Sequence, residues 1–383
     1  MSVIFTAVPI YFLLGCFLFA IAVQLFFALY FSMRSLFVFY NQRHKKPDVQ
    51  PVSVIICAHN EAKNLARFLP AILSQRYTNE SGENCFEVIV VNDASTDESN
   101  EVLLDLEKKF QHLIHVSISQ DQPRTFKGKK FALSLGVQQA QYELLLLTDA
   151  DCFPTSDNWL KEMTSPLLED KEIVAGFGDM KAQPGFLNAF IRWETLHTFV
   201  QFTGFARAGL PFMAVGRNLA CKKSVFIQAQ QSLLWNNIPS GDDDLLMRCC
   251  ANANNTEIVA TQQAITISEP KQTWAEWLHQ KQRHVSTGKL YKPIVQVLLT
   301  GYAFSHAAMW TLFITLLFVA PTFYLFAGMV VRSGLYWGIW IIADKKLRAG
   351  KITPLLPFCD FGWAVYNFVL SPYIFLKNKQ QWK

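Results

Sequence analysis

The sequence predicts a predominantly parallel α/β domain placed between membrane-spanning segments. Three observations predict this organisation: an excess of apolar residues, its concentration at the two ends of the chain, and short apolar runs that alternate with helical patterns in the middle. The chain has 383 residues, 51% of them hydrophobic, and 32 phenylalanines. This composition is too apolar for an ordinary soluble domain, so the excess must belong to segments that meet lipid.

The first apolar segment lies at the amino terminus. Residues 3–31 contain no charged side chain, and no basic segment precedes them, which separates this stretch from a cleavable signal peptide. The basic residues that follow include Arg34, Lys45 and Lys46, and such residues flank membrane spans on the cytoplasmic side. We therefore expect a retained transmembrane helix and basic linker over 1–46, with the amino terminus outside.

Four short apolar runs in the middle of the chain predict strands that are covered on both faces. Helical patterns follow at residues 60–75, after a cap at Ser95 or Thr96, and at 128–140. This alternation predicts a mainly parallel sheet within a cytoplasmic domain over 47–270. The predicted strands are 52–58, 86–91, 112–118 and 143–148.

Acidic and amide side chains follow three of these strands. Ligands of parallel sheets bind beyond the carboxyl ends of the strands, where the sequence places Asn60 and Glu61, then Asp93, then Asp149 and Asp151. Two carboxylates two residues apart can hold a hard divalent cation that bridges a diphosphate, although the same spacing also occurs in ordinary turns. Asp93 has a similar alternative, since it could simply cap the next helix.

Three consecutive acids, Asp242, Asp243 and Asp244, stand at the predicted start of a helix. A solvated helix start is one interpretation, because the helix dipole favours negative charge there. In a partly enclosed site, mutual repulsion would instead raise the pKa of at least one carboxyl group, which suits a general base.

The order of several short motifs resembles the membrane-bound family 2 glycosyltransferases, which have the GT-A fold. The resemblance covers about residues 50–290 and rests on SVIICAHNEAKNL, VIVVNDASTD, GKKFALSLG, LLLLTDAD, GRNLACKKS, SGDDDLLMR and QKQRH, in that order. It implies a GT-A catalytic domain that transfers a sugar from a nucleotide diphosphate donor with inversion.

The resemblance also implies roles for residues on the donor side. Asp93 would bind the base, usually uracil, while the loop that contains Ala58, Asn60 and Glu61 would lie beside the nucleotide. Lys129 would approach the diphosphate.

The metal and the base follow from the same resemblance. Asp149 and Asp151 would form the second carboxylate motif and hold Mg²⁺ or Mn²⁺. Asp242 would be the general base, and Asp243 is the alternative because the register of the DDDL motif is ambiguous by one residue.

On the acceptor side the chain departs from the family pattern. The family has Gln-x-x-Arg-Trp where this chain has Gln280, Arg283 and His284, so the ring that often borders the acceptor sugar is replaced. Gln280 and Arg283 remain available to the donor, the arginine as a diphosphate clamp. His284 and Asn218, the latter in the GRN motif, are expected on the acceptor side.

The C-terminal third of the chain is predicted to meet the membrane. Residues 271–292 predict an amphipathic helix on the bilayer surface. The region 293–383 contains two predicted spans, at 296–319 and 322–343, followed by the basic loop KKLRAGK. The segment PLLPFCDFGWAVYNFVLSPYIFL would form a third span or a re-entrant hairpin.

The charge and cysteine content restrict the partners. The net charge of +5 does not require a nucleic acid, because much of the Lys and Arg flanks membrane segments, where it meets anionic lipid. The eight cysteines form no Cys-x-x-Cys pair, which favours reduced thiols over disulfides or zinc ligands.

Three functions are compatible with this organisation. The favoured one is an enzyme of the bacterial inner membrane that adds one or a few sugars to a lipid-linked or other membrane-proximal glycan acceptor. The second is a processive polysaccharide synthase that extrudes its product, which is disfavoured because few spans with few polar residues cannot line a conduit. The third is a non-catalytic scaffold that binds nucleotide sugars, and the presence of all the expected acids argues against it.

Overall fold

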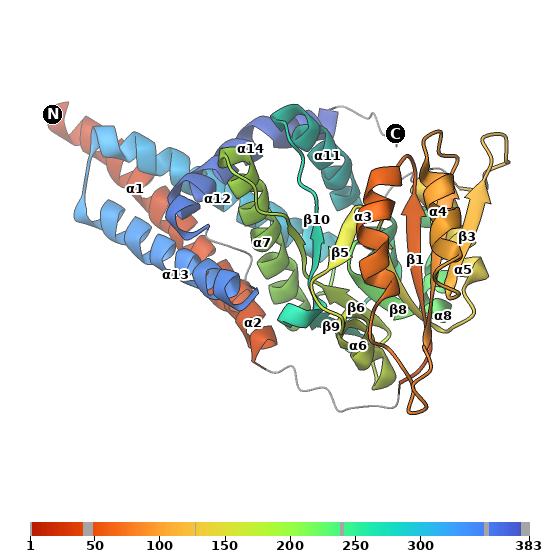
Figure 1. Ribbon diagram of the computed structural model, residues 1–383. Helices are drawn as coiled ribbons and strands as arrows, with labels where there is room; N and C mark the ends of the chain where they lie inside the picture. The colour runs from red at the N-terminus through yellow and green to blue at the C-terminus, as the bar shows by residue number, and fades with distance from the viewer. Residues whose placement is uncertain (1, 41–48, 127, 238–240, 348–351, 377–383) are drawn as a thin grey trace.

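The computed structural model describes residues 2–40, 49–126, 128–237, 241–347 and 352–376, and within these ranges the side chains of 2–8, 283–287 and 370–376 are excluded. Figure 1 shows an α/β domain beside a bundle of long helices, with one further helix, α7, between the two. The fold class predicted from the sequence is therefore confirmed.

The main sheet has seven strands in the order β3-β2-β1-β4-β8-β6-β9. The four predicted strands are confirmed as β1, β2, β3 and β4, and they pair in parallel. Strand β8 runs antiparallel to both β4 and β6, so the sheet is mixed at this side. The strands are β1 (Val52–Ala58), β2 (Phe86–Asp93), β3 (Leu113–Ile118), β4 (Leu144–Asp149), β6 (Ile173–Gly176), β8 (Leu219–Lys222) and β9 (Thr256–Val259).

Helices cover both faces of this sheet, because its central strands are apolar on both sides. The predicted cap of the second helix is wrong. That helix begins at Ser99, while Ser95 and Thr96 form hydrogen bonds with Asn60 of the neighbouring loop. The helices of the domain are α3 (Ala62–Leu73), α4 (Ser99–Glu107), α5 (Lys129–Gln139), α6 (Trp159–Thr164), α8 (Lys223–Gln230), α9 (Leu233–Asn237) and α10 (Asp242–Cys250).

A second sheet of three short strands lies at the edge where the site forms. Its order is β5-β10-β7, and β10 pairs antiparallel with β5 and parallel with β7. The strands are β5 (Cys152–Pro154), β7 (Gly178–Met180) and β10 (Thr266–Ser268). Because β5 begins directly after Asp151, this sheet fixes the end of the loop that carries the two carboxylates.

Helix α7 (Phe186–Arg207) joins the α/β domain to the helical bundle, and α11 (Trp274–Ser286) lies next to it. The buried side chains of α7 point to all sides, among them Trp193, Phe199 and Phe202. A helix that is apolar all round needs partners on every face, and α7 contacts β7 on one side and α2 and α13 on the other.

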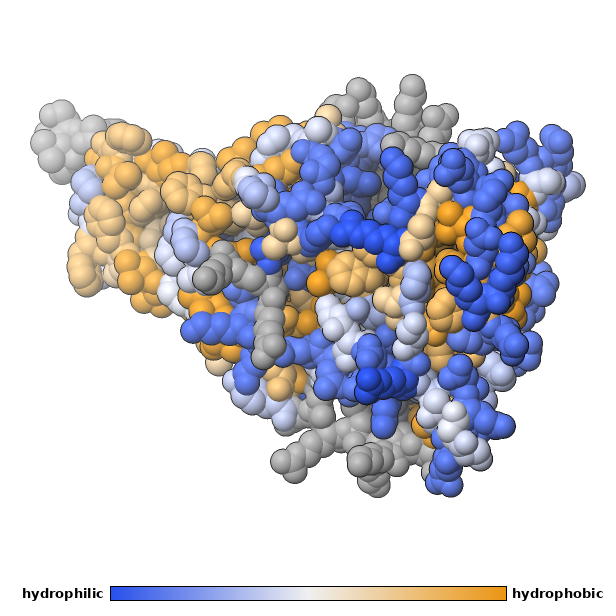
Figure 2. Space-filling model, viewed as in Figure 1, coloured by the Kyte–Doolittle hydropathy of each residue, from blue (hydrophilic) through white to orange (hydrophobic). Residues whose placement is uncertain are grey.

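Three helices of the described chain are long and apolar enough to cross a membrane: Pro9–Phe39, Pro293–Val319 and Phe323–Leu347. The first comprises α1 (Ser2–Phe27), a π-turn (Ala28–Ser32), α2 (Met33–Leu36) and a final 3₁₀ turn, and the others are α12 and α13. Their outer side chains form the apolar surface at the left of Figure 2. The three spans predicted at 3–31, 296–319 and 322–343 correspond to these helices.

The last apolar segment forms one helix, α14 (Leu356–Leu376), that crosses the bundle (Figure 1). The re-entrant hairpin expected as one alternative is not formed by the described residues, and α14 is not among the candidate spans. It packs on α12, α7 and α11. Short 3₁₀ turns occur at Phe37–Phe39, Ser165–Leu168, Gln262–Ala264, Thr287–Leu290 and Thr353–Leu355.

A buried polar cluster joins the helices of the bundle. Asp360 of α14 forms an ion pair with Arg332 of α13 and a hydrogen bond, at 2.8 Å, with the ring of His306 in α12. Arg332 also donates to the side chain of Gln24 in α1, 3.1 Å away. Each of the four side chains is at most 1% exposed, so the cluster fixes the mutual positions of four helices within the apolar region.

Candidate functional site

The predicted polar residues gather where β1, β2 and β4 end. Cys57, near the end of β1, lies among them: burial raises the pKa of its thiol to about 12, Lys129 opposes this, and Asp242, Asp149 and Asp93 add to it. Five residues from separate parts of the chain thus share one edge of the sheet, as expected for ligand sites of such sheets.

The loop after β1 has an unusual backbone that holds it against the loop after β2. Asn60 has a φ of 56°, and Ala94, at the end of β2, has a φ of 53°. Residues other than glycine rarely adopt this left-handed backbone conformation, so neighbouring groups must hold Asn60 and Ala94 in it. The Asn60 N–H donates to Ser95 Oγ at 2.9 Å, and Thr96 N–H donates to Asn60 Oδ1 at 2.8 Å. These hydrogen bonds therefore hold together the loops that follow β1 and β2.

Asp93 is buried and is held by an arginine that the motifs did not identify. Arg124 donates to both carboxylate oxygens, at 2.7 and 3.2 Å. Asp93 is 1% exposed, whereas the arginine side chain is one-third exposed. The expected base-binding carboxylate thus already has a counter-charge, supplied by a partly exposed arginine.

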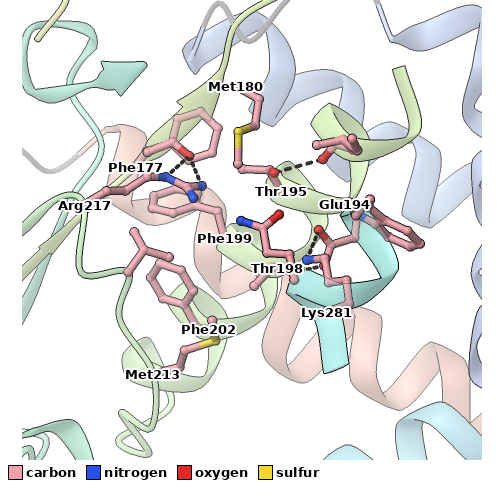
Figure 3. A pocket seen from close by; sticks show the side chains of 15 residues that line it. Phe177, Met180, Glu194, Thr195, Thr198, Phe199, Phe202, Met213, Arg217 and Lys281 are labelled. Carbon is pink, nitrogen blue, oxygen red and sulfur yellow. Dashed lines mark hydrogen bonds and ion pairs between the residues drawn. The ribbon is translucent and has the colours of Figure 1, made fainter. Parts of the chain in front are cut away.

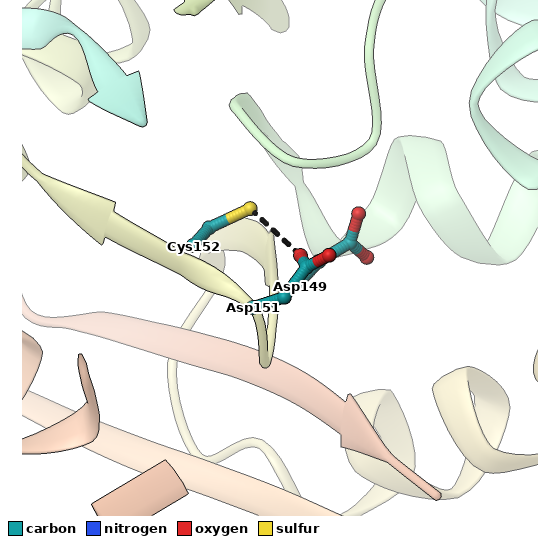
Figure 4. Close-up of side chains that lie close together, drawn as sticks. All are labelled: Asp149, Asp151 and Cys152. Atoms are coloured by element: carbon teal, nitrogen blue, oxygen red, sulfur yellow. Dashed lines mark hydrogen bonds between the residues drawn. The ribbon is translucent and has the colours of Figure 1, made fainter. Parts of the chain in front are cut away.

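Asp149, Asp151 and Cys152 bring their ligand atoms within 4.8 Å of one another (Figure 4). Lys129 Nζ forms an ion pair with Asp149, so an ammonium group already compensates one carboxylate. Two carboxylates close together fit a hard divalent cation, because such ions require oxygen ligands and negative charge. The residues present therefore suit Mg²⁺ or Mn²⁺.

The electrostatics of this corner favour added positive charge. Burial raises the pKa of Asp151, and the neighbouring Asp149 raises it further. Burial also raises the pKa of Glu61, and both aspartates add to the shift. Burial alone would lower the pKa of Lys129, yet Asp149 and Asp242 raise it well above its usual value. A cation bound here would stabilise all three carboxylates in their ionised form.

The three acids at the start of α10 lie in different surroundings. Asp243 accepts the Gly216 N–H at 2.8 Å and the Asp244 N–H at 2.9 Å. Burial and the neighbouring Asp242 raise the pKa of Asp243 to about 6. Asp242 raises the pKa of Lys129, so Asp242 faces the region of the two carboxylates Asp149 and Asp151, here called the metal corner. Tyr291 Oη donates to Asp244 at 3.3 Å.

A pocket of about 520 Å³, open on one side, lies between α7, α11 and the loop before β8 (Figure 3). Aromatic and aliphatic side chains form most of its wall, and Gln280 faces it from α11. Lys281 of α11 forms an ion pair with Glu194 of α7 at its rim. Arg217 lines the opposite side and donates twice to the Gly178 carbonyl, at 2.6 and 3.2 Å.

Asn218 does not fit its expected place on the acceptor side. It is fully buried, accepts a hydrogen bond from the Trp159 indole, and donates to the carbonyls of Phe177 and Ala264. Both ends of the amide are thus used to join the two sheets, and none is left for a substrate. Arg283 and His284 belong to α11, but their side chains lie outside the described residues.

Sequence reasoning missed Arg124 and Arg217. Arg217 directly precedes Asn218 in the GRN motif, and it is Arg217, not the buried Asn218, that lines the pocket. The signal for Arg124 was weaker, because it stands in a polar loop between a strand and a helix, and only the fold brings it to Asp93.

Comparison with known proteins shows what kind of protein this chain is similar to. Residues 53–228 match the family model Glycosyl transferase family 2. The chain is 25% identical over 323 residues to the probable glycosyltransferase YdaM of Bacillus subtilis, which covers 82% of this chain and 72% of that protein. It is 24% identical over 142 residues to a poly-beta-1,6-N-acetyl-D-glucosamine synthase of Staphylococcus aureus, a match that covers 34% of this chain and 32% of that protein.

Among solved structures, the chain resembles the mannosyltransferase PcManGT from Pyrobaculum calidifontis in complex with GDP-Man and Mn²⁺. The TM-score is 0.58 at 17% sequence identity, and the superposition covers 93% of this chain and 99% of that one. At this identity the likeness establishes the fold.

Proposed function

Because this chain carries a family 2 glycosyltransferase domain and is a glycosyltransferase of GT-A fold, we propose that it transfers a sugar from a UDP-sugar to a membrane-bound acceptor with inversion. The observation that carries the proposal is the meeting of Asp149, Asp151, Lys129 and Asp242 at one edge of the sheet. Two carboxylates for a cation, a lysine for a diphosphate and a carboxylate for a proton are the groups that direct displacement requires.

The nucleotide lies over the ends of β1 and β2 in this proposal. Uracil offers one imide N–H beside two carbonyl oxygens, so it can donate to Asp93 while a carbonyl accepts from Arg124. Guanine would place its two adjacent N–H groups on both oxygens of Asp93 and so compete with both hydrogen bonds of Arg124, whereas uracil competes at one oxygen only. Cytosine and adenine present an acceptor where Asp93 needs a donor. This pattern favours a UDP-sugar.

The diphosphate lies beside Lys129 and the two carboxylates. Asp149 and Asp151 hold the divalent cation, which when bound supplies positive charge to the leaving diphosphate. With a cation compensating Asp149, the ammonium group of Lys129, which pairs with Asp149 in this structure, would be available to donate to a phosphate oxygen. The lysine thus serves the empty and the loaded site in different ways.

Asp242 takes the proton of the acceptor hydroxyl. Asp243 is less suited because both of its oxygens accept backbone N–H groups, one of them from Gly216. We assign Asp243 the task of holding the loop that carries Arg217, and Asp242 the catalytic task. A base on the face opposite the leaving diphosphate gives inversion in one displacement.

The acceptor enters through the pocket between α7 and α11. Its apolar wall, together with Gln280 and the ion pair of Glu194 and Lys281, suits an amphipathic molecule with a polar head. Because α7 also packs on the membrane bundle, this pocket lies close to the bilayer surface. A lipid-linked acceptor would reach it from the cytoplasmic leaflet, with the α/β domain in the cytoplasm and the amino terminus outside.

The test uses purified full-length protein with Mn²⁺, lipid extract and a panel of labelled UDP-, GDP- and CDP-sugars. We expect label from a UDP-sugar to enter the organic phase, and EDTA to abolish transfer. Asp151→Asn should behave like EDTA while the protein stays folded, because an amide is a poorer ligand for a hard cation. Transfer from GDP-mannose alone would overturn the donor assignment, and full activity in EDTA would overturn the role of the metal.

A further inference from the structure

The metal corner contains a thiol whose position no catalytic motif explains. Cys152 is the first residue of β5, and its Sγ lies 3.3 Å from Asp151 Oδ1 (Figure 4). The same Sγ lies 2.9 Å from Ser268 Oγ. Ser268 is the register partner of Cys152 in the antiparallel pair of β10 and β5. Both side chains are buried, the cysteine completely. The Ser268 hydroxyl, the Cys152 thiol and the Asp151 carboxylate are therefore connected by consecutive hydrogen bonds.

The direction of these hydrogen bonds follows from the groups involved. An ionised carboxylate only accepts, so the Cys152 S–H donates to Asp151 Oδ1. The sulfur then accepts from the Ser268 O–H. In the described part of the chain the thiol is the only side chain that donates a hydrogen bond to Asp151. One oxygen of Asp151 is thus held from inside the protein, and the other is left for a cation.

A carboxylate needs such a restraint, because rotation about its terminal torsion is broad and roughly two-fold. The ion pair of Lys129 with Asp149 is an interaction with which a bound cation would compete. The restraint on Asp151 differs, since Ser268 and Cys152 are register partners in paired strands, and a cation at the carboxylates would not compete with that pairing.

We propose that Cys152, supported by Ser268, is a positioning residue that presents Asp151 to the divalent cation. This inference rests on the proposed function only in that Asp151 is a metal ligand. Cys152 itself is not a ligand here, because its sulfur is enclosed between β5 and β10 and is already bonded on both sides. Outer hydrogen bonds of this kind commonly change metal affinity by about 10- to 100-fold.

The experiment measures Mn²⁺ binding to the purified full-length protein, in the presence of UDP, from the EPR signal of free Mn²⁺. Cys152→Ala removes the donor and should raise the Mn²⁺ Kd about 10-fold. Cys152→Ser keeps an O–H donor at the same place and should bind Mn²⁺ within about 3-fold of the wild-type protein. Ser268→Ala should have an intermediate effect, since the thiol remains but loses its own support.

Unchanged Mn²⁺ affinity in folded Cys152→Ala would overturn the proposal. If this variant does not fold, Ser268→Ala decides, and wild-type affinity there would count against it. If Cys152→Ser loses Cd²⁺ binding as completely as Cys152→Ala, sulfur is a direct ligand and the positioning role is wrong. Asp151→Asn distinguishes a failure of the proposed metal site from a failure of the positioning role of Cys152. Normal Mn²⁺ binding in Asp151→Asn would refute the metal site, whatever the Cys152 variants show.

Discussion

Lys129 Nζ lies against the carboxylate of Asp149, so the lysine occupies the position where positive charge is needed before any cation is bound. The two residues come from α5 and β4, 20 positions apart. Burial alone would lower the pKa of this lysine, yet the surrounding carboxylates raise it, so the ammonium form persists at every physiological pH. Lys129 therefore competes with a metal ion for Asp149, and it is also placed to bind the diphosphate.

Lys129→Met should separate these two effects. Mn²⁺ binding without nucleotide should tighten several-fold, because the competing ammonium is gone, while UDP binding in saturating Mn²⁺ should weaken about 10-fold through loss of a charge-assisted hydrogen bond. Isothermal titration calorimetry measures both. Lys108→Met is the matched control, since Lys108 pairs with Asp105 on the exposed surface. Weaker Mn²⁺ binding in Lys129→Met would contradict the competition.

Asp242→Asn should lower kcat by at least about 100-fold and change the UDP affinity by less than about 3-fold, because a base acts on the acceptor side. The measurement is a single-turnover assay together with UDP binding. Asp170→Asn, on the surface beside Lys171, is the control for a lost carboxylate. If Asp243→Asn shows the catalytic pattern and Asp242→Asn is mild, the base is the second acid of the three.

Asp243 should give the protein a characteristic pH dependence. Its pKa is raised from 3.8 to about 6, so the folded state holds this proton more tightly than the unfolded state does. The contribution of Asp243 to the free energy of unfolding therefore falls as the pH rises from about 4 to about 6, and is constant above that range. Above the range the ionised group accepts the Gly216 N–H with full charge.

The thermal stability of wild-type protein and Asp243→Asn, measured at several pH values in the same detergent, tests this assignment. The difference between the two proteins should change between pH 4 and 6 and be flat from pH 7 to 8, with the wild type losing its relative advantage as the pH rises. A flat difference throughout would mean that Asp243 titrates normally.

The elements that the sequence predicted are those whose pattern is local. Strands β1 to β4 are runs of apolar residues long enough to be recognised alone, and the polar residues after them follow directly. Strands β5, β7 and β10 have three residues each, and they exist only because distant segments pair. No sequence window contains that information.

The site shows the same limit at the level of single residues. Asp149 and Asp151 are two positions apart, so the sequence could pair them. The partner of Asp93 is Arg124, which comes from another segment of the chain. The partner of Asp151 is its neighbour Cys152, which the composition identifies only as a buried thiol. Asn218 was misplaced for a related reason: a polar residue in a motif is expected to face a ligand, but here it joins two sheets through three hydrogen bonds.

The ion pair of Arg332 and Asp360 should be required for the assembly of the helical bundle. Asp360→Asn leaves a buried arginine without its counter-charge and should cost about 3–5 kcal/mol of stability. The double variant with Arg332→Met and Asp360→Leu should recover most of this loss, because two apolar side chains replace both charges. Thermal unfolding in detergent measures the effect. Equal loss in the single and double variants would mean that the charges do not act as a pair.

The product should contain one or a few sugars, because the described helices of the membrane region show no polar path for a polymer. A glycan crossing the bilayer needs a conduit lined by polar side chains. Two buried ionisable groups of the described spans, His306 and Arg332, both bond Asp360 of α14 and so join helices together, while the buried Asp344 lies in the last turn of α13.

This expectation distinguishes the chain from the polysaccharide synthase that it matches over 34% of its length. Purified protein given labelled UDP-sugar and lipid extract should yield a discrete product of low mass on chromatography, and longer incubation should raise its amount without lengthening it. Asp242→Asn provides the blank, since it should bind the donor without transferring it. A ladder that extends to high polymer, made without added partner proteins, would show that the polar cluster opens or that copies of the chain together build the conduit.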